Sequence, residues 1–435
     1  MSENPSVELA PRVIPRSEHN ITRKNINESA IKVLYRLHQA GYQAYLVGGG
    51  VRDLLLHLEP KDFDVATDAT PEQIKALFSN CRIIGRRFRL AHIHFGREIV
   101  EVATFRGHHQ QADDDARAAM TKDGMIIRDN VYGTLAEDAW RRDFTVNALY
   151  YNIADFSVVD YTGGYTALQA RRLSMIGDAG VRCQEDPVRI LRAIRFAAKL
   201  DFTLDTALLD AIAEQKHRIE AVPPARLFDE VLKLFLGGYA LKTYRLLREY
   251  GLLEMLFPAT HKCLTTNAND IDKMIEQGCM NTDLRIQQGK PVTPAFLFAF
   301  LLWGPIKTRA HEFEQNGMSP IQSLQEAGRA ILHQQAAFIA IPKRFRLPIR
   351  DIWTGQARLR NRRWRRASWM LEQTRFRAVY DFLLLRYESG EQSLQELSDW
   401  WTRFQSLNEK ERRAMCQELQ RIRQGQKPRK PKKKA

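Results

Sequence analysis

The pattern of hydrophobic and polar positions predicts a mixed α/β region near the start of the chain. Ile31, Leu34 and Leu37 recur at helical spacing, and Gly41 behind them is a typical helix stop. Shorter apolar runs with strand-like alternation follow, separated by turn residues. The predicted elements are a helix from Glu28, a strand Gln43–Val47, a helix from Val51 to Leu58, a strand with Asp62 and Asp64, a helix with a capping box from Thr70 to about Phe78, and a hairpin of His92–Phe95 and Glu98–Thr104.

Helical periods dominate the later part of the chain. Little strand-like alternation is found beyond Met175, and residues 186–420 are predicted to be mostly α-helical. The polar, acid-rich segment His108–Thr121 has no apolar period and is predicted to be a surface excursion. The predicted organisation is a mobile leader over 1–25, an α/β head over 26–170, a helical neck over 171–260, a helical body over 261–420 and a basic tail over 421–435.

The charge of the chain favours a polyanionic partner. Lys and Arg number 66 against 51 Asp and Glu, which gives a net charge of +15. Counterion release favours binding of such a chain to phosphates, so nucleic acid is the favoured partner class. Residues 421–435 hold eight Lys and Arg and no acid, which predicts a disordered basic tail.

Cysteine usage and hydropathy predict the compartment. The five cysteines are scattered and form no C-x-x-C pair, which argues against a disulfide framework or a zinc site and for a reducing compartment. The first thirty residues show no secretory signal, and no run of eighteen apolar residues occurs. A cytoplasmic protein without a transmembrane segment is therefore expected.

A glycine-rich turn about a dozen residues ahead of two carboxylates is the strongest chemical signal. Asp62 and Asp64 are spaced i, i+2, so on an extended strand both side chains would face one spot. Two carboxylates on one spot repel unless a cation lies between them, and hard oxygen ligands near a phosphate suit Mg²⁺. Gly48 and Gly49 open a short predicted helix whose backbone N–H groups suit phosphate. Taken singly, a plain tight turn and a solvated strand edge are the simpler interpretations, but together the parts predict metal-assisted transfer to or from a nucleotide.

The same stretch resembles the first motif of a known family. LVGGGVRDLL followed by KDFDVATDAT is similar to the opening of the palm in class II polymerase β-like nucleotidyltransferases, the group that holds tRNA CCA-adding enzymes and bacterial poly(A) polymerases. The resemblance implies that Asp62 and Asp64 are catalytic carboxylates that bind two Mg²⁺ ions, for which Mn²⁺ could substitute. It also implies that Gly48, Gly49 and Arg52 bind the phosphates of the nucleotide.

A second motif follows in family order. RRDFTVNAL at residues 141–149 reads by itself as a capped helix start with solvated arginines. It resembles the family motif RRDFTxNA, which assigns Arg142 to the nucleotide or its phosphates, Asp143 to a further catalytic carboxylate and Asn147 to a nucleotide contact. Guanidinium forks suit triphosphate, and a carboxylate suits a ribose hydroxyl.

The third motif is EDPVRILRAIRFA at residues 185–197. Its apolar positions predict a helix with a buried stripe, and a solvated charged face is the default interpretation of its arginines. The run resembles the family motif EDPxRxLRAxRFA, which implies that Asp186 and Arg189 read the incoming base and that Arg192 supports the nucleotide. Protein side chains, without a template strand, would then choose the base.

Two features lie outside these motifs. Glu101 is a lone acid inside an apolar strand, where acids usually face solvent; in a palm sheet this strand lies beside the strand of Asp62 and Asp64, which makes Glu101 a candidate third metal ligand. Six arginines surround Trp364 within Arg358–Arg366. That composition suits stacking on single-stranded RNA, whereas a charged helix face with Trp364 in the core explains it equally well.

The resemblance implies a fold and an activity. The expected fold is an α/β nucleotidyltransferase palm followed by an all-α neck, body and leg region, and the flanking stretches 85–92, 105–109 and 341–344 resemble the poly(A) polymerase branch of the family. The expected enzyme adds AMP from ATP to RNA 3′-OH ends without a template, in poly(A) tailing that promotes RNA turnover. Expected partners are RNA with a free 3′-OH, ATP and RNA-decay or RNA-chaperone proteins, and a monomer is expected. A tRNA CCA-adding enzyme and a non-catalytic basic RNA-binding adaptor are the alternatives.

Overall fold

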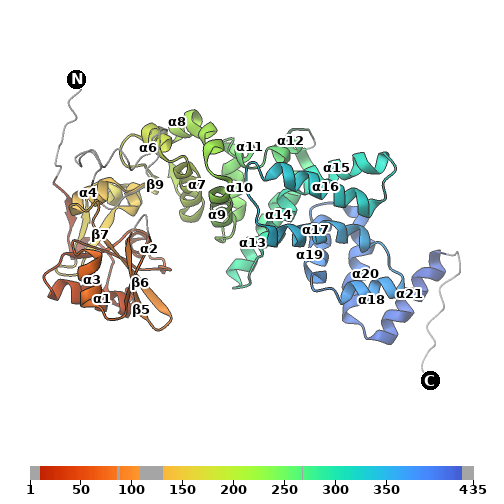
Figure 1. Ribbon diagram of the computed structural model, residues 1–435, viewed down its shortest axis with the longest axis horizontal. Coiled ribbons are helices and arrows are strands. Elements are labelled where there is room, and N and C mark those ends of the chain that lie inside the picture. The colour runs from red at the N-terminus through yellow and green to blue at the C-terminus, as the bar shows by residue number, and fades with distance from the viewer. Residues whose placement is uncertain (1–9, 86–88, 108–130, 267, 424–435) are drawn as a thin grey trace. The chain divides into compact units, whose positions relative to one another are not determined.

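The computed structural model describes residues 10–85, 89–107, 131–266 and 268–423. The predicted surface excursion His108–Thr121 lies outside the described residues. The chain separates into two compact units, Met1–Arg218 and Ile219–Ala435 (Figure 1). The first holds the sheet and the second is helical, so an α/β head followed by a helical region is confirmed.

The first unit consists of ten short strands and eight α-helices among its described residues. The strands are β1 (Arg12–Ile14), β2 (Ala44–Val47), β3 (Asp64–Thr67), β4 (Cys81–Ile84), β5 (Leu90–Phe95), β6 (Glu98–Thr104), β7 (Leu149–Asn152), β8 (Val158–Asp160), β9 (Arg172–Leu173) and β10 (Thr203–Leu204). The helices are α1 (Glu28–Gln39), α2 (Gly49–Leu55), α3 (Pro71–Leu77), α4 (Leu135–Trp140), α5 (Gly164–Gln169), α6 (Ala179–Glu185), α7 (Val188–Leu200) and α8 (Thr206–Gln215).

Eight strands form one mixed sheet in the order β1-β8-β7-β2-β3-β6-β5-β4. All neighbouring pairs are antiparallel except β3 and β6, which run parallel. Helices α1 and α3 pack against the sheet, α1 on β2, β3 and β6, and α3 on β4 and β5. Figure 1 shows α4 on the other side of the sheet from α1 and α3. The sheet is therefore a central layer between helices, with its middle strands buried.

Local sequence signals account for the helices around this sheet. The side chain of Asn27 caps α1, and Val33, Leu34 and Leu37 on one face of that helix are buried. The capping box of α3 forms as predicted, with the Thr70 hydroxyl accepting from the Gln73 N–H and the Gln73 side chain accepting from the Thr70 N–H. Helix α2 spans Gly49–Leu55 and so begins and ends earlier than the predicted range Val51 to Leu58. Gly48, whose φ is +73°, is its N-cap residue.

One transverse row of residues crosses the middle of the sheet. Tyr150 on β7 is in register with Val47 on β2, which is in register with Asp64 on β3. Asp64 in turn is in register with Glu101 on β6, and Glu101 with His92 on β5. Register partners on neighbouring strands point their side chains to the same face. Polar and charged groups therefore line up on one face of the sheet, at the level where β3 begins.

The second unit is built from helices among its described residues. They are α9 (Pro224–Phe235), α10 (Ala240–Glu249), α11 (Leu253–Leu256), α12 (Pro258–Thr266), α13 (Ala268–Gln287), α14 (Pro294–Leu301), α15 (Trp303–Gln315), α16 (Pro320–Gln335), α17 (Lys343–Arg358), α18 (Trp364–Leu371), α19 (Phe376–Glu388), α20 (Gln395–Ser406) and α21 (Glu409–Arg423). Trp353 and Trp401 are fully buried, and each indole N–H donates to a backbone carbonyl, of Ala299 and Leu359 respectively. Large aromatic side chains with satisfied N–H groups thus hold these helices together.

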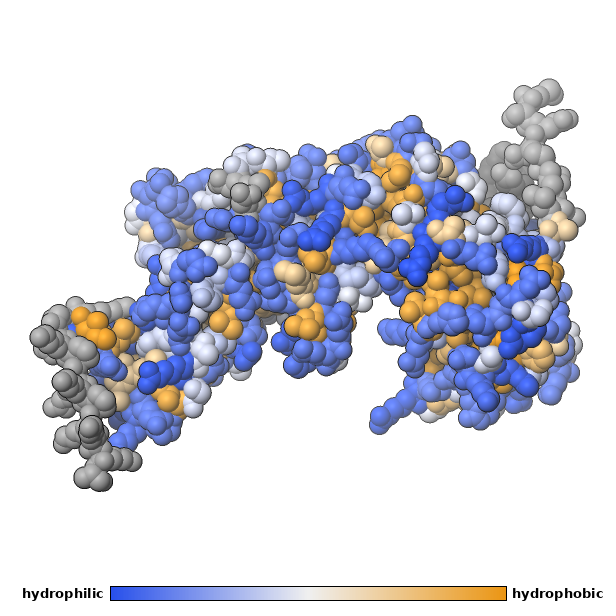
Figure 2. All heavy atoms as spheres, turned by 180° about the vertical axis from the view of Figure 1, so that it is seen from behind, coloured by the Kyte–Doolittle hydropathy of each residue, from blue (hydrophilic) through white to orange (hydrophobic). Residues whose placement is uncertain are grey.

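The visible surface is largely hydrophilic. Figure 2 shows hydrophilic residues over most of the face turned to the viewer, with hydrophobic residues in separate groups. Over the described ranges, no helix is long and apolar enough to cross a membrane. The predicted basic tail begins three residues too early, because residues 421–423 complete α21; residues 424–435 lie outside the described part of the chain.

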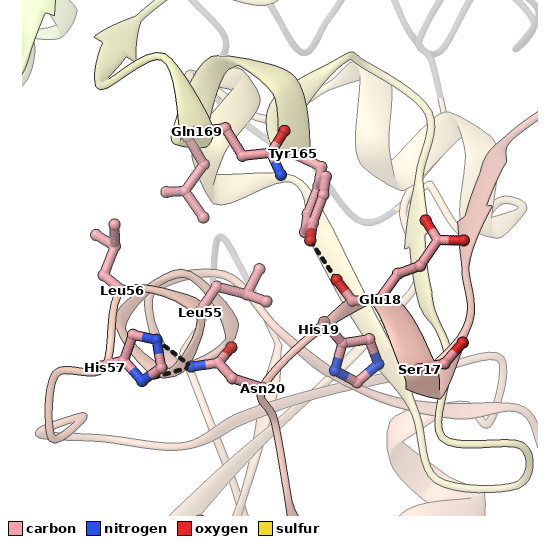
Figure 3. Close-up of a pocket in the computed structure, with 10 residues that line it drawn as sticks. Ser17, Glu18, His19, Asn20, Leu55, Leu56, His57, Tyr165 and Gln169 are labelled. Carbon is pink, nitrogen blue, oxygen red and sulfur yellow. Dashed lines mark hydrogen bonds between the residues drawn. The ribbon is translucent and has the colours of Figure 1, made fainter.

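The predicted mobile leader is wrong for residues 10–25. Strand β1 pairs with β8 at the edge of the sheet, where Arg12 is in register with Asp160, and Ile14 and Ile21 are buried. Beyond β1, the hydroxyl of Tyr165 donates to the Glu18 carbonyl at 2.7 Å. Figure 3 shows this segment lining a pocket of about 420 Å³ with the end of α2 and with α5. The prolines and the lack of periodicity in this segment favour mobility, but pairing of β1 with the distant strand β8 satisfies its backbone N–H and C=O groups.

Candidate nucleotide-binding site

Two acidic residues stand at the start of β3. Asp64 is the first residue of the strand and is partly buried, whereas Asp62 lies two positions before it and is exposed. The prediction that both carboxylates lie on one strand therefore needs correction, since Asp62 belongs to the preceding loop. Both carboxylates still act on each other: the charge of Asp62 contributes to the raised pKa of Asp64.

Burial and neighbouring carboxylates make the ionised form of Asp64 unfavourable, and a bound cation would stabilise that form. Burial raises its pKa to about 6, with further increases from Glu101 and Asp62 and an opposing decrease from Arg142. A carboxylate surrounded by other carboxylates is stabilised in its charged form by a positive partner. The donor set of carboxylate oxygens fits a hard divalent cation.

The strand of Glu101 lies beside the strand of Asp64, as the palm resemblance implied, and the structure adds that the two residues are in register. The carboxylate Oε1 of Glu101 is 3.4 Å from Nε2 of His92, the next residue in the transverse row. Across the part of the chain that the structure describes, no group of three or more His, Cys, Asp and Glu side chains is arranged to hold a metal ion. The structure thus places Glu101 beside Asp64 without gathering Asp62, Asp64 and Glu101 into one ligand set.

The glycine turn approaches the second motif closely. A Cβ on Gly48 would lie 3.5 Å from Nη1 of Arg142, and φ at Gly48 is +73°, where a side chain would also be strained. A Cβ on Gly50 would lie 3.3 Å from the carbonyl oxygen of Asp62. These glycines let the backbone of α2 approach both Asp62 and Arg142, so the first two motifs meet at this turn.

Arg52 is buried and bound to protein groups. Its Nη1 donates to Oδ1 of Asn147 at 2.6 Å, and its Nε donates to Oδ1 of Asp53 at 2.8 Å. Lys199 on α7 is paired with the other carboxylate oxygen of Asp53 at 3.1 Å. Arg52 therefore links the glycine turn to the second motif and, through Asp53, to helix α7.

Arg142 is held by two residues that the motif does not include. Its Nε and Nη2 donate to Oδ2 of Asp138 at 3.2 and 2.9 Å, and its Nε also donates to the hydroxyl of Tyr150 at 2.8 Å. Burial alone would raise the pKa of Asp138, but the charge of Arg142 and these hydrogen bonds hold it below its usual value. The Arg142 guanidinium thus stays charged and oriented beside the glycine turn.

Asp143 is paired with Arg192 from the third motif. Both Nε and Nη2 of Arg192 contact Oδ2 of Asp143, the former at 2.7 Å, and Asn147 donates to Oδ1 at 3.4 Å. Burial would raise the pKa of Asp143, but Arg192 and these hydrogen bonds lower it. Asp143 is therefore an ionised carboxylate that joins the second motif to helix α7.

Asp186 and Arg189, the predicted base-reading residues of the third motif, lie at the junction of α6 and α7. Asp186 ends α6, and its side chain accepts from the Val188 N–H at 3.2 Å. Nη1 of Arg189 donates to the Arg182 carbonyl at 2.7 Å and to Oε2 of Glu185 at 2.8 Å. These contacts fix Arg189 before any nucleotide is bound.

The structure connects several of the predicted site residues. Contacts join Arg52 to Asn147, Asn147 to Asp143 and Asp143 to Arg192, while Arg142 borders Gly48. Asp186 and Arg189 lie in the same unit, at the junction of α6 and α7. The connecting residues that sequence analysis missed are Asp53, Asp138, Tyr150, Glu185 and Lys199. Among these, only the i, i+4 spacing of Asp138 and Arg142 and of Glu185 and Arg189 offered a signal.

The arginine-rich segment around Trp364 has a structural explanation. Trp364 is partly buried against the aromatic cluster of the C-terminal helices, and the guanidinium of Arg413 lies 5.0 Å from its ring centroid. Arg362 is buried and bidentate to Glu396. On the same helix as Trp364, Trp369 is 42% exposed. Of the two tryptophans of α18, Trp369 is therefore the more exposed to solvent.

Comparisons with known proteins place the chain among poly(A) polymerases. Three family models match: Poly A polymerase head domain over residues 44–174, Probable RNA and SrmB-binding site of polymerase A over 201–264, and Polymerase A arginine-rich C-terminus over 316–435. Poly(A) polymerase I of Salmonella typhimurium is 47% identical over 411 residues, 94% of this chain and 88% of the relative. The CCA-adding enzyme of Bacillus pumilus is 35% identical over 227 residues, 52% of this chain and 54% of the relative.

A solved structure shows the fold. The CCA-adding enzyme of Bacillus stearothermophilus in complex with CTP has a TM-score of 0.61 and 23% identity, and the alignment covers 88% of this chain and 82% of that one. The arrangement of a sheet-bearing head followed by helices is therefore a known one.

Proposed function

The chain belongs to the poly(A) polymerase I family and is a nucleotidyltransferase that adds AMP from ATP to RNA 3′ ends; we propose which of its residues perform each part of that reaction. The assignment follows the three motifs and the contacts that join them. The RNA 3′-hydroxyl attacks the α-phosphorus of ATP, pyrophosphate leaves, and the RNA grows by one AMP.

Asp62 and Asp64 form the catalytic end of the site. They would hold Mg²⁺, or Mn²⁺ in its place, and when bound there the metal supplies positive charge that makes the 3′-hydroxyl more acidic and neutralises the triphosphate. Glu101 is the proposed third oxygen ligand because it stands beside Asp64 in register. To serve as one, its carboxylate must leave His92, which lies 3.4 Å away.

Arg142 and the glycine turn bind the triphosphate. Nη1 of Arg142 lies beside Gly48, where a phosphate oxygen can accept from both the guanidinium and the turn's backbone. Gly49 belongs to the same turn. Arg52 is bound to Asn147 and Asp53, so its contribution to phosphate binding requires an exchange of one of these partners.

Asp143 and Asn147 bind the sugar, and Asp186 and Arg189 in the neck bind the base. Asp143, ionised and held by Arg192, accepts a hydrogen bond from a ribose hydroxyl, and Asn147 beside it contacts the same nucleotide. Asp186 and Arg189 offer an acceptor and a donor set to the edge of the adenine. Because Glu185 already orients Arg189, base choice requires little rearrangement of that side chain.

The observation that carries this proposal is the meeting of Asp64, Gly48 and Arg142 at one level of the sheet, with the charge of Arg142 acting on Asp64. The test uses purified protein with Mg²⁺, an unstructured RNA with a free 3′-OH, and a tRNA that lacks its last three nucleotides. Each acceptor receives one nucleoside triphosphate at a time. We expect a long ladder with ATP alone on the unstructured RNA.

The tRNA arm of that experiment tests the alternative that the Bacillus pumilus relative suggests. Addition that stops after three nucleotides, on tRNA only and with a need for CTP, would make the protein a CCA-adding enzyme. No addition to either acceptor, with RNA binding retained, would support the non-catalytic adaptor. We also propose that the protein acts in mRNA processing and RNA decay in the cytoplasm. It would act there as a monomer, together with RNA-decay or RNA-chaperone proteins.

A further inference from the structure

Arg142 is anchored on one side only. Its hydrogen bonds to Asp138 and Tyr150 use Nε and Nη2, and the remaining nitrogen, Nη1, is the atom that borders Gly48. The side chain of Arg142 is 25% exposed while that of Asp138 is 10% exposed. The anchored edge of the guanidinium therefore faces the protein interior, and the other edge faces the glycine turn.

The two anchoring residues are themselves fixed by rigid elements. The other oxygen of Asp138, Oδ1, accepts from the Arg106 N–H at 3.2 Å, just beyond β6. Tyr150 is fully buried in β7, and its hydroxyl donates to Oδ2 of Asp138 at 2.7 Å. Tyr150 is also two strands away from Asp64 in the transverse row, roughly 10 Å between backbones.

We propose that Asp138 and Tyr150 are positioning residues that aim the Nη1 edge of Arg142 at the triphosphate of ATP. This inference rests on the proposed role of Arg142 in binding that triphosphate. Asp138 supplies the charge that balances the guanidinium, and the Tyr150 hydroxyl selects one orientation by bonding to both partners at once. Without them, Arg142 is free to turn toward the carboxylates of Asp64 and Glu101, whose charges attract it.

Pre-orientation matters here because charge moves to the leaving pyrophosphate during the reaction. A guanidinium already aimed at that charge stabilises it without reorganisation, whereas a mobile one must be ordered in the transition state. The positioning role therefore predicts a loss that depends on the phosphates of the ligand and not on its base or sugar.

The second unit offers a matched control with the same three residue types. Tyr244 donates through its hydroxyl to Oδ1 of Asp272 at 2.7 Å, and Nη1 of Arg248 contacts Oδ2 of the same carboxylate. Tyr244→Phe removes one buried tyrosine hydroxyl from an Arg–Asp–Tyr trio, as Tyr150→Phe does. A general effect of losing such a hydroxyl would appear in both variants.

The experiment compares Tyr150→Phe, Asp138→Asn and Tyr244→Phe in the full chain. Measurements are kcat/KM for ATP on an unstructured RNA, equilibrium binding of ATP and of AMP, and the thermal unfolding midpoint. We expect kcat/KM for ATP to fall about tenfold in Tyr150→Phe and about a hundredfold in Asp138→Asn. ATP binding should weaken while AMP binding stays within about twofold of the parent, and Tyr244→Phe should keep the parent activity.

Three outcomes would overturn the inference. The first is parent-like ATP kinetics in Tyr150→Phe, and the second is an equal loss of ATP and AMP binding. The third is a comparable loss of activity in Tyr244→Phe. Should Asp138→Asn fail to fold, Tyr150→Phe, which keeps the volume of the ring, decides the matter.

Arg142→Lys separates this inference from the proposed function. If Arg142→Lys is impaired while Tyr150→Phe is not, Arg142 binds phosphate but needs no positioning by Tyr150. If Arg142→Lys itself retains full ATP kinetics, the assigned role of Arg142 is wrong, and the positioning inference falls with it.

Discussion

The two Arg–Asp–Tyr trios of this chain use the same hydrogen bonds in different surroundings. In the second unit, Tyr244 and Arg248 lie one turn apart on α10 and both contact Asp272 on α13, so the trio fastens two helices together. In the head, Asp138 on α4 and Tyr150 on β7 hold Arg142, which lies just after α4. The head trio has a glycine turn beside its arginine, and the chain there adopts a φ that favours glycine.

The difference teaches that an Arg–Asp–Tyr trio is not by itself a sign of function. The side chains of Arg248 and Asp272 are 39% and 29% exposed, and such partly exposed pairs contribute little to stability. Those of Arg142 and Asp138 are 25% and 10% exposed. The head trio differs because Nη1 of Arg142 lies beside the glycine turn. The charge of Arg142 also partly offsets the increase in the pKa of Asp64.

The largest expected effect is on AMP incorporation, and it distinguishes Asp64 in the first unit from Asp272 in the second. Asp64→Ala should lower AMP incorporation by about a thousandfold or more, because charge stabilisation at the reacting phosphate is lost. RNA binding, measured by filter retention, should stay at the parent level. Asp272→Ala, which removes the acid of the second trio, should keep AMP incorporation. Retained incorporation in Asp64→Ala would contradict the catalytic assignment.

The next effect concerns what each arginine neutralises. Arg192→Ala leaves Asp143 as a buried charge, since the Asp143 side chain is only 13% exposed. Its unfolding free energy should fall by about 3 kcal/mol, as expected when one partner of a buried pair is removed. Arg248→Ala should cost less than about 1 kcal/mol, because Asp272 reaches solvent. Urea denaturation of the two variants tests this, and equal losses would count against a buried Asp143 charge.

A smaller effect depends on pH. Folding raises the pKa of Asp64 from 3.8 to about 6, so the ionised form of Asp64 destabilises the folded protein. This destabilisation is complete above about pH 6 and absent below about pH 4, where Asp64 is protonated in both states. Asp64→Asn should therefore be more stable than the parent by on the order of 2 kcal/mol at pH 7.5 without divalent metal. That advantage should shrink as the pH falls from 6 to 4. Denaturation midpoints at several pH values measure it, and a difference that does not change with pH would refute the raised pKa.

The smallest effect distinguishes two tryptophans of α18 in the second unit. Trp369→Ala should weaken binding of single-stranded RNA by about 1 kcal/mol through loss of base stacking, with little change in unfolding midpoint. Trp364→Ala should do the reverse, because Trp364 packs against the aromatic cluster. Fluorescence anisotropy with a labelled RNA, beside thermal denaturation, gives both quantities. RNA affinity that depends on Trp364 alone would reverse the assignment.

Local signals were sufficient for several elements of the head. The capping box at Thr70 and Gln73 and the strand Glu98–Thr104 appear as predicted, because hydrogen bonds between near neighbours and alternation of side chains determine them. The pairing of Glu101 with Asp64 followed once the order of strands in a palm was assumed. The leader failed for the opposite reason, since β1 is stabilised by residues almost 150 positions away.

The site divides in the same way. Asp62 and Asp64 were predicted as metal ligands from their spacing, and the resemblance to family motifs implied Arg142, Asp143, Asp186 and Arg189 as further site residues. The contacts between such residues were not predicted, since Arg192 meets Asp143 across 49 positions and Lys199 meets Asp53 across 146. No local pattern encodes such pairs.

The sequence by itself determined the family, the class of reaction and the residues that can carry charge to a nucleotide. Only the tertiary structure decided which of those charges are already paired, which edge of Arg142 remains for a ligand, and that Trp369 and not Trp364 is exposed. The physical reason is that residue chemistry is local, whereas burial and charge pairing depend on segments that the sheet and the neck helices bring together.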